Sequence, residues 1–235
     1  MAYLQNMCPS ELKAAAENGA QLMIAAGSIE YHGSQLPLGT DLFIVDGLLR
    51  EIEKRADVVI APPFTFCPTG FMVSGPELGT VDIHPGTFIQ YCAEILSCYK
   101  KMGFKKIYVL VHHQGGNISR FLKIAVEQIN SYGAYEDAGY GWWTERKQPA
   151  DTCDIEIAAT IIGENDVKSE FFGHGGKGET QPIMALYPEL VKMDKLTDNE
   201  AWWNESAPEA NKQNSDKAME ILINNWLEKL EADKK

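Results

Sequence analysis

The sequence lacks the features that mark secreted and membrane proteins. Its five cysteines are odd in number and widely spaced, with no Cys-x-x-Cys pair, so a disulfide framework and a zinc ribbon are excluded and reduced thiols are favoured. No apolar run reaches the roughly 18 residues of a membrane span. No basic segment followed by an apolar run stands at the start of the chain. We therefore expect a cytoplasmic protein without a membrane partner.

Positive charge is also scarce. The chain has 21 lysines and arginines against 33 aspartates and glutamates, which gives a formal net charge of −12. Nucleic acid would repel such a surface and is not expected as a partner. A small polar substrate is compatible with it, because a metal site sets its own local field. There is no internal repeat, low-complexity tract or linker, so we predict one domain over residues 1–235.

Short apolar runs alternate with segments of helical periodicity. Three runs have the length and composition of buried strands: 22–26, 58–61 and 107–111. The first proline pair, Pro62-Pro63, is expected to stop the second strand. Helices are predicted at 41–55, 87–102 and 118–129, with a last one from about residue 206, while 155–162 fits a strand or a short helix. This alternation predicts an α/β fold with a mostly parallel sheet and helices on both faces.

The loop after the first strand carries a candidate metal site. In an extended chain Glu30 and His32 project to the same side just past the strand end. A turn through Pro37 and Gly39 then brings back Asp41, immediately before a helical pattern. Two acids and an imidazole at one place suit a metal ion. Alternatively, the first two are surface loop residues and Asp41 is a helix N-cap, and spacing alone leaves both interpretations open.

A long irregular segment at 62–86 is rich in proline, glycine and aromatic residues. Such a segment inside a compact domain is often functional. We interpret it as one wall of a substrate pocket, with Phe64, Phe66, Phe71 and Met72 as lining residues. The alternative is that these side chains fold back onto the core.

Several separated motifs resemble those of the creatininase (creatinine amidohydrolase) family. They are Gly-Ser-Ile-Glu-Tyr-His-Gly followed by Leu-Pro-Leu-Gly-Thr-Asp within 27–41, His-Pro-Gly-Thr at 84–87, Gly-Gly-Asn at 115–117, and His-Gly-Gly-Lys-Gly-Glu-Thr at 174–180. Motifs that recur in the same order are more specific than any one alone. The resemblance covers about residues 20–190. It implies an α/β fold and a divalent-metal hydrolase, often with two metals and often a homo-oligomer.

The resemblance also implies roles for single residues. Asp41 would bridge two ions, with Glu30 on one and His32 on the other, and the ions would be Zn²⁺, Mn²⁺ or Fe²⁺, one or two per chain. Water held between them would become the nucleophile. His174 resembles the family's catalytic acid or base, and Glu179 resembles a glutamate that binds a metal or holds a ligand in place.

The chain departs from the family pattern after the third strand. The usual motif there is Asn-Gly-His-Gly-Gly-Asn, and Gln114 occupies the position of its ligand histidine. Either Gln114 supplies its amide oxygen, or His113 takes the place of the histidine, or one metal is lost. His113 can do so only if the strand has already ended or bulges there, because neighbouring strand residues face opposite ways. His112 is expected to form a hydrogen bond in the core or to pack beside the site.

Four residues are candidates for substrate binding: Gly115, Gly116, Asn117 and Gln35. The glycines allow close backbone approach at a helix N-terminus, where a substrate carbonyl can be oriented. An ordinary strand-to-helix turn is the alternative. Gln35 stands where relatives often carry another histidine, which indicates an altered pocket.

Three functions follow from these residues. The first is hydrolysis of a C–N bond in a cyclic amide or formamide by metal-activated water. The second is C–C ring opening of a cyclic keto-polyol such as dehydro-scyllo-inosose, which resembles the activity of some creatininase-like proteins. The third is a non-catalytic metal-binding relative, favoured only by the missing motif histidine. Retention of the acids and imidazoles of both outer motifs argues against it.

Overall fold

A computed structural model describes residues 2–113, 117–140, 153–163, 168, 170–171, 173–196 and 201–234. In these residues four parallel strands form one sheet in the order β2-β1-β3-β4. The strands are β1 (Gln21–Ala26), β2 (Val58–Phe64), β3 (Lys106–Val111) and β4 (Asp154–Ala159). The α/β fold with a parallel sheet is confirmed, and the ambiguous segment at 155–162 forms a strand.

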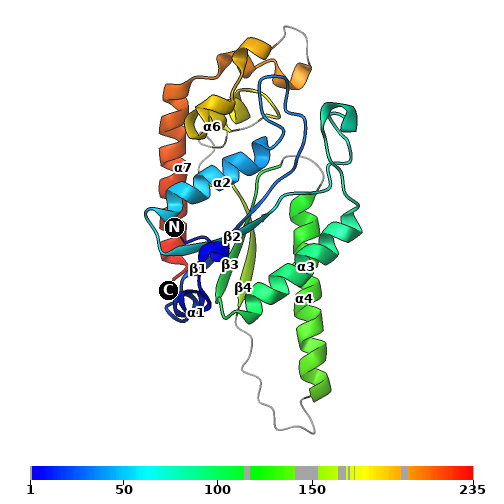
Figure 1. Cartoon of the computed structure of the whole chain (residues 1–235), viewed down its shortest axis with the longest axis vertical. Coiled ribbons are helices and arrows are strands. Elements are labelled where there is room, and N and C mark those ends of the chain that lie inside the picture. Colours follow the sequence, from blue (N-terminus) through cyan, green and yellow to red (C-terminus); the bar gives the residue numbers. More distant parts are fainter. Residues whose placement is uncertain are drawn as a thin grey trace.

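Helices cover both faces of the sheet (Figure 1). Their bounds are α1 Pro9–Glu17, α2 Thr40–Glu53, α3 Pro85–Lys101, α4 Ile118–Tyr140, α6 Lys177–Leu186 and α7 Lys212–Ala232. Single 3₁₀ turns occur at Leu4–Asn6, Pro76–Leu78, Pro188–Leu190, Met193–Lys195, Trp202–Asn204 and Ala207–Glu209. Within the described residues, no helix combines the length and the apolar character that crossing a membrane requires.

The two faces of β1 follow the strand's alternation. Leu22, Ile24 and Ala26 pack in one core with residues of α1, α3 and α4. Met23 and Ala25 point the other way, into a second core with residues of α2 and α7. A strand that is buried on both sides has a continuous apolar sequence, which is why 22–26 carries no polar residue.

Among the element ends that differ from the predicted ones, three have a clear physical cause. β2 continues through Pro62 and Pro63 to Phe64, and proline is tolerated there because β2 is the outermost strand in the order. α4 continues past Gly133, since a glycine in a helix costs only about 1 kcal/mol. α7 begins at Lys212 instead of about 206, where the Asn211 side chain accepts hydrogen bonds from two backbone amides.

Of the four residues expected to line a pocket, only Phe64, the last residue of β2, lies in the core. Phe64 is 1% exposed and packs edge-on against Phe88. The other three, Phe66, Phe71 and Met72, are exposed. For Phe64 the core interpretation therefore holds.

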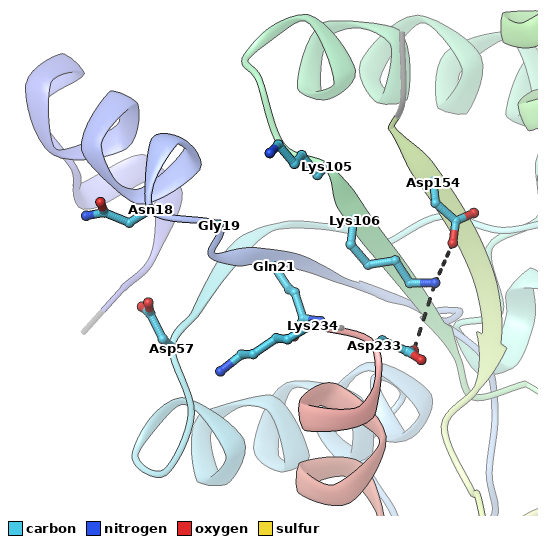
Figure 2. A pocket seen from close by; sticks show the side chains of 9 residues that line it. All are labelled: Asn18, Gly19, Gln21, Asp57, Lys105, Lys106, Asp154, Asp233 and Lys234. Carbon is cyan, nitrogen blue, oxygen red and sulfur yellow. Dashed lines mark hydrogen bonds and ion pairs between the residues drawn. The ribbon is translucent and has the colours of Figure 1, made fainter. Parts of the chain in front are cut away.

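The amino ends of the strands carry a cavity of about 630 Å³ (Figure 2). Three of its charged side chains pair with one another: Lys106 Nζ lies 2.6 Å from Asp154 Oδ2 and 4.0 Å from Asp233 Oδ2. Asp233 directly follows α7, and Lys229 of that helix also pairs with it at 3.0 Å. These contacts tie the end of α7 to the sheet.

The opposite, carboxyl ends of β1 and β3 mark the point where the strand order reverses. From β1 the chain continues to β2 on one side, whereas β3 and β4 lie on the other. In open parallel sheets the connecting segments diverge at such a point and leave room for a ligand. The first motif follows β1 and the pair His112-His113 follows β3, so both motifs emerge there.

Candidate metal centre

The loop between β1 and α2 folds back, so that its two ends lie close together. Backbone hydrogen bonds fold it: Glu30 N donates to Leu38 O at 2.9 Å, and Thr40 N donates to Pro37 O at 3.1 Å. Gly27 is required for this approach, because a Cβ there would lie 2.8 Å from the Cβ of Asp41. The fold therefore places Asp41, in the first turn of α2, beside the end of β1.

One group of potential ligands consists of Glu30, Asp41 and His113. His113 Nδ1 lies 2.8 Å from Asp41 Oδ2 and 3.3 Å from Glu30 Oε2. β3 ends at Val111, so the constraint of strand alternation no longer applies to His113. Of the alternatives for the missing motif histidine, the one in which His113 takes its place fits this geometry.

A second group consists of His32, Asp41 and Glu179. His32 Nε2 lies 3.2 Å from Asp41 Oδ1 and 3.6 Å from Glu179 Oε2. Two ligands held at about 2.1 Å by a tetrahedral ion are roughly 3.4 Å apart, so the spacing in both groups suits an ion. Asp41 belongs to both groups and directs a different carboxylate oxygen to each.

His174 lies against the second group. Its ring stacks on that of His32 with 4.2 Å between the ring centroids. The Trp203 ring packs against His174 edge to face, with 4.9 Å between centroids and 73° between the ring planes. His174 Nε2 is 2.8 Å from the carbonyl oxygen of Tyr31. A carbonyl only accepts, so Nε2 carries the hydrogen and Nδ1 has the free lone pair. Ligand atoms of Glu30, His32 and His174 also lie within 4.8 Å of one another.

The centre concentrates negative charge in the interior. Glu30, Asp41 and Glu179 are each at most 2% exposed, and in the described part of the chain their ion-pair partners are all histidines. Burial by itself lowers the pKa of His32, but Glu179 and Asp41 outweigh it and raise that pKa to about 10. Without an ion, protons on imidazoles therefore balance the carboxylates, and a divalent cation would replace them.

The other pKa shifts have related causes. Burial raises the pKa of Glu30 above its usual value, although His113 opposes it. Burial would raise the pKa of Asp41 too, yet His32 and His113 hold it well below the usual range. His174 differs, because burial and the neighbouring His32 lower its pKa and keep it neutral near pH 7. A neutral imidazole with a free Nδ1 can accept a proton.

The residues fit a divalent cation. His113 Nε2 is buried without a hydrogen-bond partner in the described residues, which is the condition that a ligand or ion relieves. His32 Nδ1 donates to the carbonyl of Glu30 at 2.9 Å, and this fixes the tautomer that leaves Nε2 free for an ion. Carboxylate and imidazole together suit Zn²⁺, Mn²⁺ or Fe²⁺.

The expected site residues fall into three sets. Six converge: Glu30, His32, Asp41, His113, His174 and Glu179. Two lie apart from the ligand groups. Gln35 is buried and donates from Nε2 to Gly175 O at 2.6 Å, so it links the first motif to the third. Asn117 is exposed and its carbonyl accepts from Arg120 N at the start of α4. The remaining three, Gln114, Gly115 and Gly116, lie outside the described residues.

Sequence reasoning missed neighbours of the centre. Ser28 donates from Oγ to Asp41 Oδ2 at 2.7 Å and so orients that carboxylate. Its place in the first motif, two residues before Glu30, was a usable signal. Trp203, 29 residues after His174 in the chain, had no such signal, because only the folded chain brings its ring onto the histidine.

Comparisons with known proteins match the chain to hydrolases of one family. The family model Creatininase, described as creatinine amidohydrolase, matches residues 5–220. A 3-dehydro-scyllo-inosose hydrolase of Thermotoga maritima is 23% identical over 209 residues, covering 84% of this chain and 60% of its own length. A creatinine amidohydrolase of Pseudomonas putida is 21% identical over 189 residues, covering 76% of this chain and 68% of its own length.

Solved structures show the same fold. A manganese form of creatininase superposes with a TM-score of 0.81 at 16% identity, covering 99% of this chain and 98% of that one. A creatininase of Zn-Zn type has a TM-score of 0.80 at 16% identity with the same coverage. At such low identity these likenesses establish the fold alone.

Proposed function

Because the chain belongs to the creatininase family, we propose that it is a divalent-metal-dependent hydrolase with its active site at the carboxyl ends of β1 and β3. One ion would be held by Glu30, Asp41 and His113, and the other by His32, Asp41 and Glu179. Zn²⁺ or Mn²⁺ are the expected ions, in keeping with the solved creatininases named for them.

The observation that carries this proposal is the position of Asp41. Its two oxygens face different histidines, at 3.2 Å from His32 Nε2 and 2.8 Å from His113 Nδ1. A carboxylate whose only task is to cap a helix would direct an oxygen to the backbone amides of its first turn. Asp41 instead directs one oxygen to each of two clusters of acids and imidazoles, as a bridging ligand would.

The chemistry then divides between the ions and His174. A bound divalent ion lowers the pKa of water and polarises a substrate carbonyl. His174 is neutral, and its Nδ1 is the atom that would accept a proton from the attacking water and return it to the leaving group. The Nε2 hydrogen bond to Tyr31 O and the stacking on His32 hold the ring in one orientation for both transfers.

We propose a C–N bond in a cyclic amide or formamide as the bond cleaved. The match to a creatinine amidohydrolase supports this class. A second candidate is C–C ring opening of a cyclic keto-polyol, which the match to a 3-dehydro-scyllo-inosose hydrolase favours. Both reactions attack a carbonyl carbon and then protonate the departing atom, so the same acid–base residue serves either. The match to this chain spans 60% of the length of the 3-dehydro-scyllo-inosose hydrolase.

The test is a metal analysis followed by a substrate panel. The purified chain should bind divalent ions, and the loaded protein should hydrolyse a member of one class among cyclic amides, formamides and cyclic keto-polyols. Failure to bind any divalent ion would refute the catalytic account. Two bound ions with no turnover of any class would favour the non-catalytic relative.

The remaining part of the proposal concerns assembly and location. A homo-oligomer is supported by the family resemblance, and a cytoplasmic location by the cysteines, none of which forms a disulfide in the structure. Size-exclusion chromatography with light scattering measures the molar mass of the protein in solution. A molar mass of 26.1 kDa, that of one chain, would contradict the homo-oligomer.

A further inference from the structure

His112, the neighbour of His113 in the chain, is an unexplained part of this centre. Its side chain is 4% exposed, and its Nε2 lies 3.6 Å from Glu179 Oε1. Neither of these two atoms has a hydrogen-bond partner in the described residues. Two buried polar atoms that face each other without partners would each carry a desolvation cost, so their approach requires a reason.

The two oxygens of Glu179 have different surroundings. Oε2 accepts a hydrogen bond from Gly175 N at 2.6 Å and faces His32 Nε2 at 3.6 Å. Oε1 has His112 Nε2 as its one ion-pair partner in the described residues. If Oε2 belongs to the ion-binding group of His32, Asp41 and Glu179, then Oε1 is the oxygen that a neighbouring donor must hold.

The backbone of His112 is anchored for that task. Its amide donates to Ala26 O at 3.2 Å, which extends the pairing of β3 with β1 by one residue. Glu179, by contrast, lies in the first turn of α6, in another part of the fold. A donor fixed to the central strands would therefore set the angle at which the Glu179 carboxylate meets the ion.

We propose that His112 is a positioning residue, which donates a hydrogen bond from Nε2 to Glu179 Oε1 and thereby holds Oε2 toward the ion shared with His32 and Asp41. This inference rests on the proposed function. The present 3.6 Å separation must shorten by roughly 0.6 Å to reach the usual N–H···O length of about 3.0 Å. A charge-assisted bond of this kind is stronger than a neutral one.

The geometry favours this role over direct coordination. No group of three potential ligands found in the described residues includes His112, whereas Glu179, His32 and Asp41 form one together. Removal of a group that holds a metal ligand in place typically costs 10–100-fold in ion affinity. That cost should fall mainly on the ion of the Glu179 group, because Glu179 is absent from the other group.

The experiment is a titration of the metal-free chain with Co²⁺, followed by calorimetry and by the visible absorption of the bound ion. We expect His112→Leu to weaken one of two affinities about 10–100-fold. We expect His112→Gln to retain both affinities and the wild-type spectrum, because its amide nitrogen reaches close to the position of Nε2. His84→Leu is the control, since His84 is an exposed cap of α3 and should change neither readout.

Each contrary outcome has its own meaning. Unchanged affinities in a folded His112→Leu would overturn the positioning role alone. Equal losses and an altered spectrum in His112→Gln and His112→Leu would make His112 a direct ligand instead. If the leucine variant fails to fold, His112→Asn replaces it, because the shorter amide cannot reach Oε1 and predicts the same loss. An unmodified chain that binds no Co²⁺ would refute the proposed function, and this inference with it.

Discussion

Asp41→Asn should abolish the stabilisation that divalent ions give to the folded chain. An ion present at 100 times its Kd adds about 2.7 kcal/mol, so two ions add about 5.4 kcal/mol. For a chain of this size each kcal/mol raises Tm by roughly 2–4 °C, which gives a total rise of about 11–22 °C. Asparagine preserves the shape of Asp41 and can still accept from Ser28, but it removes the charge that both groups share.

The assay is a thermal melt of the metal-free protein, with and without added ion. Glu51→Gln is the matched control, because Glu51 lies on the same helix, outside the ligand groups, and pairs with Lys54 at the surface. The control should show the full ion-dependent rise. A full rise in Asp41→Asn would refute the bridging role, and a half rise would show that one ion is held without Asp41.

Three further outcomes follow from the same structure. Ion binding should release protons, and ion affinity should increase with pH up to about 10, because His32 with its raised pKa must lose its proton before it binds an ion. Calorimetry in buffers of different ionisation enthalpy measures the protons released, and an ion affinity that does not change with pH would contradict the prediction. His174→Gln should lower kcat about 10²–10⁴-fold while ion stoichiometry stays unchanged; loss of an ion in that variant would make His174 a ligand instead. Leu222→Ala should lower the free energy of unfolding, measured by urea denaturation, by about 2–5 kcal/mol, because the Leu222 side chain of α7 is fully buried against the sheet. A change below about 1 kcal/mol would contradict that packing.

The sequence predicted the parts of the fold that depend on local pattern. The continuous apolar run at 22–26 predicted a strand buried on both faces, and the structure places it between two cores. Element ends were less predictable, because they depend on neighbours: Pro62 and Pro63 would break a central strand, yet β2 is outermost and includes them. Gly133 similarly fails to end α4.

The site was predictable where side chains lie close in sequence or share a recognised motif. Glu30, His32 and Asp41 belong to one motif between the end of β1 and the first turn of α2. β1 ends before Glu30, so the folded loop, and not strand alternation, brings the ligand atoms of Glu30 and His32 together. Whether His113 or Gln114 faced the site depended on where β3 ended, which a one-residue difference decides. The contact between His112 and Glu179 joins residues 67 positions apart, and only the packed fold reveals it.

The central claim is that Asp41 holds two ions at once. Anomalous diffraction from crystals of the zinc-loaded protein, recorded on both sides of the zinc absorption edge, tests it most directly. The account predicts two peaks on opposite sides of the Asp41 carboxylate, one beside Glu30 and His113 and one beside His32 and Glu179. A single peak, or peaks that leave Asp41 uncoordinated, would contradict it.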